Sequence, residues 1–184
     1  RSIKEKDKDG LVELLALTKW MTNSDITFWG ETNSKQVEVD MDIGSQSDNF
    51  GFLLPLGKGI GGLAAQNKIV LQVADYKNCE YRYKDVSKAV DKENIRTVFA
   101  LPIKDEEQNT SGVLYVGNRS INPLSFDNKF LLLRLAHQLE PIIKRKEIKQ
   151  FFTTSERKSF FRIKKAELRE MAQTAKQLKP LEKW

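Results

Sequence analysis

Three glycines, Gly57, Gly59 and Gly62, form the pattern G-x-G-x-x-G between two apolar runs, the second of which ends in Asp75. In a dinucleotide-binding loop this pattern lets backbone N–H groups approach a pyrophosphate at a helix N-terminus. An acidic residue roughly 20 positions later then binds the ribose. The chemistry to test first is therefore phosphate binding.

The spacing after the glycines argues against a dinucleotide site. Residues 63–68 alone separate Gly62 from the next apolar run, whereas a crossover to a parallel strand takes about 10–12 residues or more. Asp75 also follows Gly62 too closely. No G-K-[ST] sequence is present, and Lys58 precedes the last two glycines. We therefore expect the glycines to shape a tight turn rather than to bind a nucleotide.

Thiol and imidazole chemistry is limited by a single cysteine, Cys79, and a single histidine, His137. One cysteine excludes an intrachain disulfide and a cysteine-based zinc site. We expect Cys79 to lie in a loop or pocket wall and His137 to be a solvated or interface residue. The sequence therefore predicts no catalytic residue, no metal site and no enzyme activity.

Apolar periodicity predicts the elements that position these residues. Helical spacing covers 10–23, and strict alternation over 37–43 predicts a strand that pairs with 25–30 across a turn at 31–36. Two further strands are expected on either side of a polar turn at 104–110, and they are 97–103 and 112–117. Strands at 50–56 and 69–74 and a short helix at 60–66 are also expected.

The charged segment 77–94 is expected to be a long loop with a turn or two of helix, and a loop of this length is often functional. Ser125 is a plausible N-cap for a later helix. Pro141 should kink or end that helix. Its apolar seam has coiled-coil-like spacing and comprises Leu132, Leu135, Leu139 and Ile142.

The charge is unevenly distributed, because residues 144–184 carry 13 basic and 5 acidic residues whereas the rest of the chain is slightly acidic. The tail is expected to be helical with an apolar face. Its basic residues could contact phosphates, but we favour a solvated helix face beside a dimer seam. No run approaches the 18–20 apolar residues of a membrane span, so no membrane contact is expected. The single cysteine fits a reducing compartment, so a cytoplasmic location is expected.

Three segments together resemble a GAF domain, the small-molecule sensor module related to PAS domains. Residues 56–68 (LGKGIGGLAAQNK) are similar to the family's glycine-rich segment, and 69–75 to the strand that follows it. Residues 95–103 (IRTVFALPI) and 112–118 (GVLYVGN) resemble the family's signature hairpin, and Phe126 matches the start of its last helix. The match is good over 54–143 and weaker over 10–50.

The resemblance implies an α+β fold with a GAF/PAS-like central antiparallel sheet flanked by helices, followed by a basic C-terminal helical tail. It divides the chain into a charged lead-in (1–9), a sensor domain (10–146) and a basic helical extension (147–184). It also implies a pocket between the sheet and residues 75–95. The residues expected to bind the ligand are Phe52, Asp75, Tyr76, Arg96, Thr97, Phe99 and Tyr115. An arginine at position 96 could bind an anionic group bidentately, although a surface ion pair is the simpler interpretation.

Several special activities of the family are disfavoured. The cyclic-nucleotide signature requires an acidic pair where this chain has Phe130 and Leu131. Reduction of free methionine sulfoxide requires a set of cysteines, and bilin attachment favours a cysteine next to histidine. Cys79 is followed by Glu80.

The expected function is therefore a non-catalytic regulatory sensor that binds a small molecule of unknown identity. It would relay binding to the output domain of a bacterial transcription regulator, as a homodimer formed through its terminal helices. The alternative is a ligand-free structural or dimerisation module of a signalling protein. Direct nucleic-acid contact by the tail and an enzymatic function are the less favoured hypotheses.

Overall fold

The computed structural model describes residues 5–48, 50–105 and 107–144. Within these ranges, side chains are described from residue 10 to residue 136. The chain divides into two compact units, Arg1–Leu124 and Ser125–Trp184. In the described part of the first unit, one six-stranded sheet has the order β3-β2-β1-β6-β5-β4. All of its neighbouring strands are antiparallel. The strands are β1 (Ile26–Thr32), β2 (Gln36–Ile43), β3 (Phe52–Pro55), β4 (Leu71–Val73), β5 (Thr97–Lys104) and β6 (Thr110–Asn118).

The sheet confirms the expected α+β architecture and both expected hairpins. β1 and β2 join through a short turn in which the Asn33 side chain accepts hydrogen bonds from the backbone N–H groups of Lys35 and Gln36. β5 and β6 pair from Thr97↔Asn118 to Lys104↔Thr110. The outer strands β3 and β4 extend the sheet on either side of this four-stranded centre.

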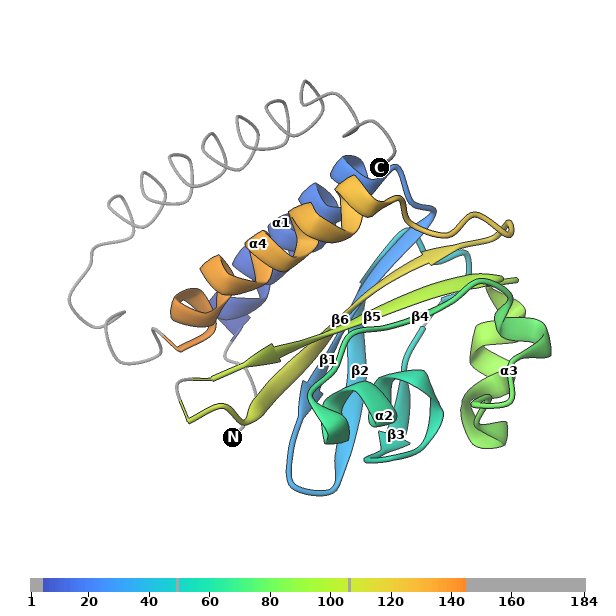
Figure 1. Cartoon of the computed structure of the whole chain (residues 1–184), viewed down its shortest axis with the longest axis horizontal. Coiled ribbons are helices and arrows are strands. Elements are labelled where there is room, and N and C mark those ends of the chain that lie inside the picture. Colours follow the sequence, from blue (N-terminus) through green and yellow to red (C-terminus); the bar gives the residue numbers. More distant parts are fainter. Residues whose placement is uncertain (1–4, 49, 106, 145–184) are drawn as a thin grey trace, which may run out of the picture. The chain divides into compact units, whose positions relative to one another are not determined.

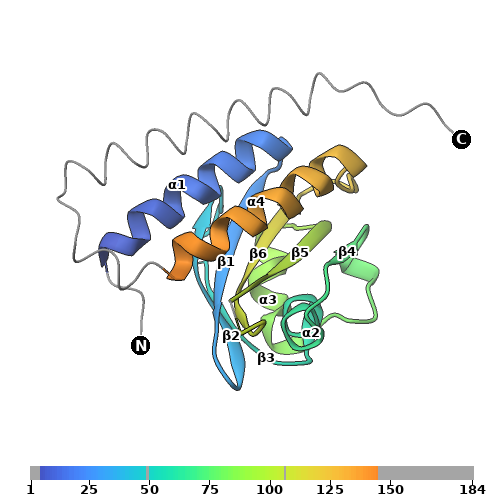
Figure 2. The same ribbon diagram turned by 60° about the vertical axis from the view of Figure 1, so that its left-hand side comes forward.

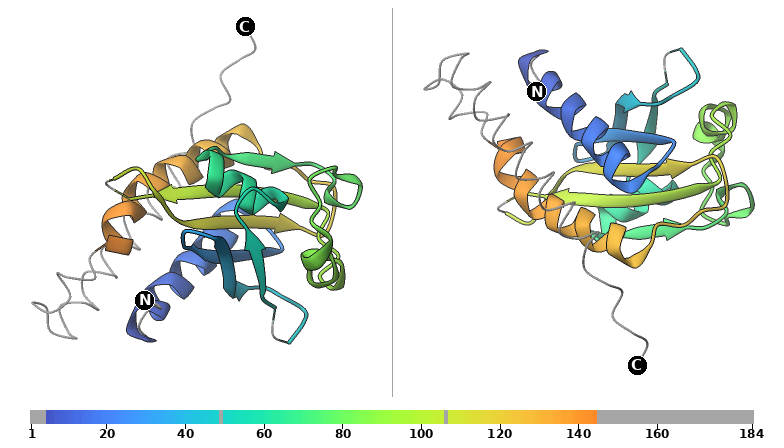
Figure 3. Two further views of the ribbon diagram at one scale, coloured as in Figure 1. Left: turned by 90° about the horizontal axis from the view of Figure 1, so that it is seen from below. Right: turned by 90° about the horizontal axis from the view of Figure 1, so that it is seen from above.

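The helices of the first unit cover both faces of the sheet (Figure 1). α1 (Glu5–Thr22) lies on one face, where the Thr27 hydroxyl of β1 donates a hydrogen bond to the Leu15 carbonyl. α2 (Gly59–Asn67) and α3 (Lys84–Lys92) lie on the opposite face, as the views from below and above show (Figure 3). Figure 2 shows α1 and α2 on opposite sides of the strands.

Two boundaries differ from the sequence-based expectation. α1 begins at Glu5, so the helix extends into the charged lead-in of residues 1–9. The segment 77–94 was expected to be mostly loop, but it contains the nine-residue helix α3 and part of a short 3-10 turn, η1 (Tyr76–Asn78). α3 was underestimated because its apolar residues are sparse. Val86 and Val90 are buried at i, i+4 spacing among charged neighbours.

The glycine-rich segment forms the sharp turn that the sequence predicts. Gly57 and Gly59 have φ angles of +78° and +61°, values that favour glycine. They connect β3 to α2 directly, with no crossover to a parallel strand. A Cβ at Gly61 would overlap the hydroxyl and ring of Tyr115, so the missing side chain lets α2 pack closely on β6.

The second unit is described through one helix, α4 (Phe126–Lys144). The Ser125 hydroxyl accepts a hydrogen bond from the Asn128 N–H at 3.2 Å, which confirms the expected N-cap. The helical backbone continues past Pro141 rather than ending there. The basic extension 147–184 lies outside the described residues. Within the described ranges, no helix is long and apolar enough to cross a membrane.

Candidate ligand-binding site

A small apolar cavity, the sheet cavity, lies between the sheet and helices α2 and α3. Its volume is about 30 Å³, enough for a water molecule. Its lining combines aromatic and aliphatic side chains with the first turn of α2: Phe28, Phe52, Leu54, Gly59, Ile60, Gly61, Tyr76, Val86, Val90, Ile95, Val98 and Tyr115. Three of the expected ligand-binding residues, Phe52, Tyr76 and Tyr115, therefore come together here.

Aromatic packing fixes the sheet side of this cavity. The Phe28 and Tyr115 rings stack with centroids 4.4 Å apart and an interplanar angle of 11°. Phe52 contacts Phe28 edge-on, with centroids 6.2 Å apart. Because neighbouring rings restrain Tyr115, its hydroxyl has a defined direction.

That hydroxyl is the unusual feature of the cavity. Tyr115 is 2% exposed, and its Oη has no hydrogen-bond partner among the described residues. Burial raises the pKa of Tyr115, so the hydroxyl stays protonated. An unpaired buried hydroxyl is costly, and such groups are rare enough in native structures to require an explanation.

Tyr76 is the second tyrosine of the cavity lining. Burial raises the pKa of its hydroxyl. The Arg82 guanidinium lies 5.8 Å from the ring centroid of Tyr76.

A wider groove of about 490 Å³ lies beside the cavity, between α3 and the 47–53 segment. It shares Phe52 and Val86 with the cavity wall. Lys88, Lys92 and Asp85 of α3 line its outer part. The groove and the cavity therefore adjoin at these two side chains.

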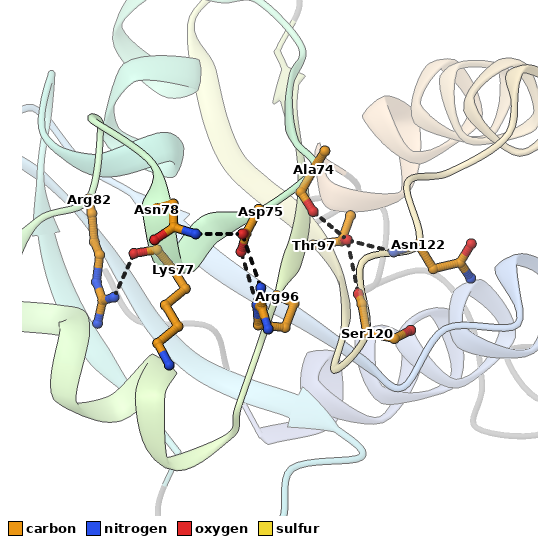
Figure 4. Close-up of polar contacts among 9 residues, drawn as sticks. All are labelled: Ala74, Asp75, Lys77, Asn78, Arg82, Arg96, Thr97, Ser120 and Asn122. Carbon is orange, nitrogen blue, oxygen red and sulfur yellow. Dashed lines mark hydrogen bonds and ion pairs between the residues drawn. The ribbon is translucent and has the colours of Figure 1, made fainter.

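Asp75 and Arg96 pair with each other outside the cavity (Figure 4). The Arg96 Nε donates to Asp75 Oδ1 at 2.9 Å and Nη2 to Oδ2 at 3.0 Å. The hydrogen bond from Arg96 lowers the pKa of Asp75, and the same bond raises the pKa of Arg96. Asn78 also donates to Asp75. The bidentate face of Arg96 is occupied, which fits the ion-pair interpretation rather than ligand binding.

Thr97 has a structural role at the start of β5. Its hydroxyl lies 3.0 Å from the carbonyl oxygens of both Ala74 and Ser120, and it accepts the backbone N–H of Asn122 at 3.0 Å (Figure 4). These contacts tie the end of β4 to the loop after β6. Thr97 is buried and does not line the cavity.

Phe99 requires a correction, because it lies on the opposite face of the sheet from the cavity. Phe99 pairs with Val116, which in turn pairs with Thr27, the residue bonded to α1. Directly paired residues share a face of the sheet, and successive residues alternate between faces. β5 is a continuous apolar run that is buried on both faces, so the sequence did not indicate which of its side chains meet the pocket.

The residues expected to form a dimer or relay seam lie on α4. Leu132 and Leu135 are 0% and 1% exposed, and their part in a dimer or relay stays a prediction. Leu139 and Ile142 lie outside the described side chains, as does His137. Exposed apolar side chains on α4 are instead Phe126, Phe130 and Leu133.

The sequence analysis missed Glu93 and Arg119. Glu93 is fully buried, and its carboxylate accepts hydrogen bonds at 2.8 Å from the N–H groups of Gln46 and Ser47 and from Arg119 Nη2. Burial raises the pKa of this carboxyl, but these hydrogen bonds outweigh burial and lower it. Both residues stand in charged or polar stretches, so no local pattern predicted that they form an ion pair.

Within the described residues, no three histidine, cysteine or acidic side chains lie close enough together to hold a metal ion. Cys79 is a half-buried free thiol at the edge of the core, and its sulfur accepts the Tyr81 N–H.

No family model matches the chain, and no curated protein does. Solved structures do match its fold. The GAF domain of an Acinetobacter phosphoenolpyruvate-protein phosphotransferase has a TM-score of 0.64 at 16% identity, over 79% of this chain and 87% of that one. The GAF domain of a Bacillus halodurans two-component sensor histidine kinase has a TM-score of 0.65 at 14% identity, over 77% and 96%.

An enzyme also has this fold. A type II free methionine-R-sulfoxide reductase from Thermoplasma acidophilum matches with a TM-score of 0.63 at 13% identity, over 77% of this chain and 95% of that one. The fold alone therefore does not decide between binding and catalysis. What the antiparallel sheet, its flanking helices and these matches establish together is that the chain contains a domain with the GAF fold.

Proposed function

We propose that this domain is a non-catalytic sensor that binds a small molecule in the sheet cavity and relays occupancy toward α4 and the residues after it. The observation that supports this most is the buried Tyr115 hydroxyl at the wall of an apolar cavity, which has no partner among the described residues. Small-molecule sites are typically apolar with a few convergent polar groups. The parent protein would be a cytoplasmic signalling protein such as a bacterial transcription regulator.

The relay can begin at α3, the wall of the cavity next to the groove. Glu93 caps the end of α3 and pairs with Arg119, which directly follows β6. β6 carries Tyr115, and the chain continues from Arg119 through residues 120–124 into α4. A ligand that displaces α3 would thereby bias the segment leading to α4 through a shift in population.

A second function, that of a ligand-free structural module, is favoured by the small size of the cavity. About 30 Å³ is far below the roughly 300–1,000 Å³ of typical ligand pockets. A sensor therefore has to open along α3 to admit a metabolite, whereas a structural module would remain closed.

A cavity-filling variant separates the two functions. Val98→Ile adds one methylene at the cavity wall, and Val73→Ile makes the same change on β4 outside the lining. In a thermal-shift screen of metabolites, a sensor ligand should stabilise the wild type and Val73→Ile but stabilise Val98→Ile much less. A screen without any hit, or hits that act equally on Val98→Ile, would favour the structural module.

Homodimerisation through the terminal helices is part of the proposal. Phe126, Phe130 and Leu133 have i, i+4, i+7 spacing on α4 and are 77%, 48% and 42% exposed. Sedimentation of wild type and Phe130→Glu tests it, since a dimer through this face should dissociate in the variant.

Direct nucleic-acid contact would come from basic residues outside the described ranges.

A further inference from the structure

The polar groups at one end of the sheet cavity indicate which class of ligand would bind there. The inference drawn from them rests on the proposed sensor function. Tyr115 Oη is buried without a partner among the described residues. It lies against Gly61, where a Cβ would overlap it. The hydroxyl therefore meets the first turn of α2.

That turn supplies hydrogen-bond donors without side-chain caps. Gly59, Ile60 and Gly61 are the first three residues of the nine-residue α2, and all three line the cavity. The N-cap residue, Lys58, makes no side-chain capping bond. The first N–H groups of a helix lack intrahelical acceptors and carry a partial positive charge. The hydroxyl and the helix terminus thus form one donor-rich corner.

Apart from Tyr76, the remaining lining is apolar. Phe28, Phe52, Val86, Val90, Ile95 and Val98 face the same cavity, and none of the described residues that line it is charged. A ligand that fits both parts has one acceptor end and a hydrocarbon body.

We propose that the sheet cavity binds a short aliphatic monocarboxylate. Its carboxylate accepts hydrogen bonds from Tyr115 Oη and the N–H groups of the first turn of α2. A helix N-terminus favours an anion over a neutral acceptor, and it offsets the cost of burying the charge. The present volume suits the carboxylate group alone, so the hydrocarbon body displaces Val86 and Val90 of α3 toward the adjoining groove.

The test compares three molecules with the same body: 3-methylbutanoate, 3-methylbutanamide and 3-methylbutan-1-ol. Binding is measured by calorimetry at neutral pH, with thermal shift in parallel. The variants are Tyr115→Phe and the control Tyr81→Phe, whose exposed ring does not line the cavity. We expect the carboxylate to bind at least about tenfold more tightly than the amide or alcohol. Tyr115→Phe should weaken it about tenfold or more, while Tyr81→Phe should not.

The outcomes distinguish this inference from the sensor function. Equal affinity for all three molecules, or carboxylate binding that is unchanged in Tyr115→Phe, overturns the monocarboxylate inference and leaves the sensor function standing. No binding of 3-methylbutanoate to the wild type also overturns it and indicates that Tyr115 hydrogen-bonds a buried water. The metabolite screen with Val98→Ile then decides the sensor function independently. A cooperative unfolding transition of Tyr115→Phe confirms that the variant is folded.

Discussion

Glu93 Oε2 and Arg119 Nη2 lie 2.8 Å apart, and this ion pair joins the end of α3 to the loop that follows β6. Arg119 also donates from Nε to the Glu93 carbonyl at 3.1 Å and from Nη2 to the Gly44 carbonyl at 2.9 Å. The Glu93 carboxylate also accepts the N–H groups of Gln46 and Ser47. Glu93 therefore joins the end of α3 to the 46–47 segment and to the loop after β6.

Glu93→Ala is expected to destabilise the domain by about 2–4 kcal/mol, because it leaves the guanidinium and two N–H groups without their acceptor. Urea unfolding followed by circular dichroism measures the change. The control is Asp91→Ala, which removes the partner of Arg82 in an exposed pair and should cost less than about 1 kcal/mol. Equal losses in the two variants would show that Glu93 is not a buried anchor.

The same carboxyl predicts an acid-dependent loss of stability. The folded-state pKa of Glu93 is lowered, so its contribution is complete above the unfolded-state value. It is lost as the pH falls below about 4.3 and through the folded-state pKa. Glu93→Gln cannot titrate, so its free energy of unfolding should fall less steeply between about pH 5 and pH 3 than that of the wild type. Parallel curves for the two proteins would contradict this assignment.

Tyr115→Phe is expected to stabilise the ligand-free domain. The change removes a buried hydroxyl that has no partner among the described residues while keeping the ring that stacks on Phe28. The gain should be about 1–3 kcal/mol, the cost of leaving such a group unpaired. Thermal and urea unfolding without added ligand provide the measurement. A loss of stability would instead show that the hydroxyl is satisfied by water in solution.

Local patterns in the sequence predicted most of the strands and helices, whereas they underestimated α3 and did not predict the polar pairings. Alternation in 37–43 predicted β2, because exposure on one face leaves a period of two. β5 and β6 were predicted as apolar runs on either side of a polar turn. The bond from Arg96 to Asp75 spans 21 residues and that from Arg119 to Glu93 spans 26. Neither distance has a local signature, so those roles required the folded chain.

Gly61→Ala tests whether the approach of α2 to Tyr115 is obligatory. Replacing glycine by alanine inside a helix normally stabilises it by about 1 kcal/mol. Here the added Cβ would overlap the Tyr115 hydroxyl and ring, and stacking on Phe28 hinders the ring from moving away. We therefore expect the opposite sign, a loss of about 1–3 kcal/mol through overpacking. Tyr115→Leu removes the obstructing ring, so Gly61→Ala should cost much less in that background. Unfolding free energies of the two single variants and the double variant give the coupling, and additive values would mean that the two residues do not restrain each other.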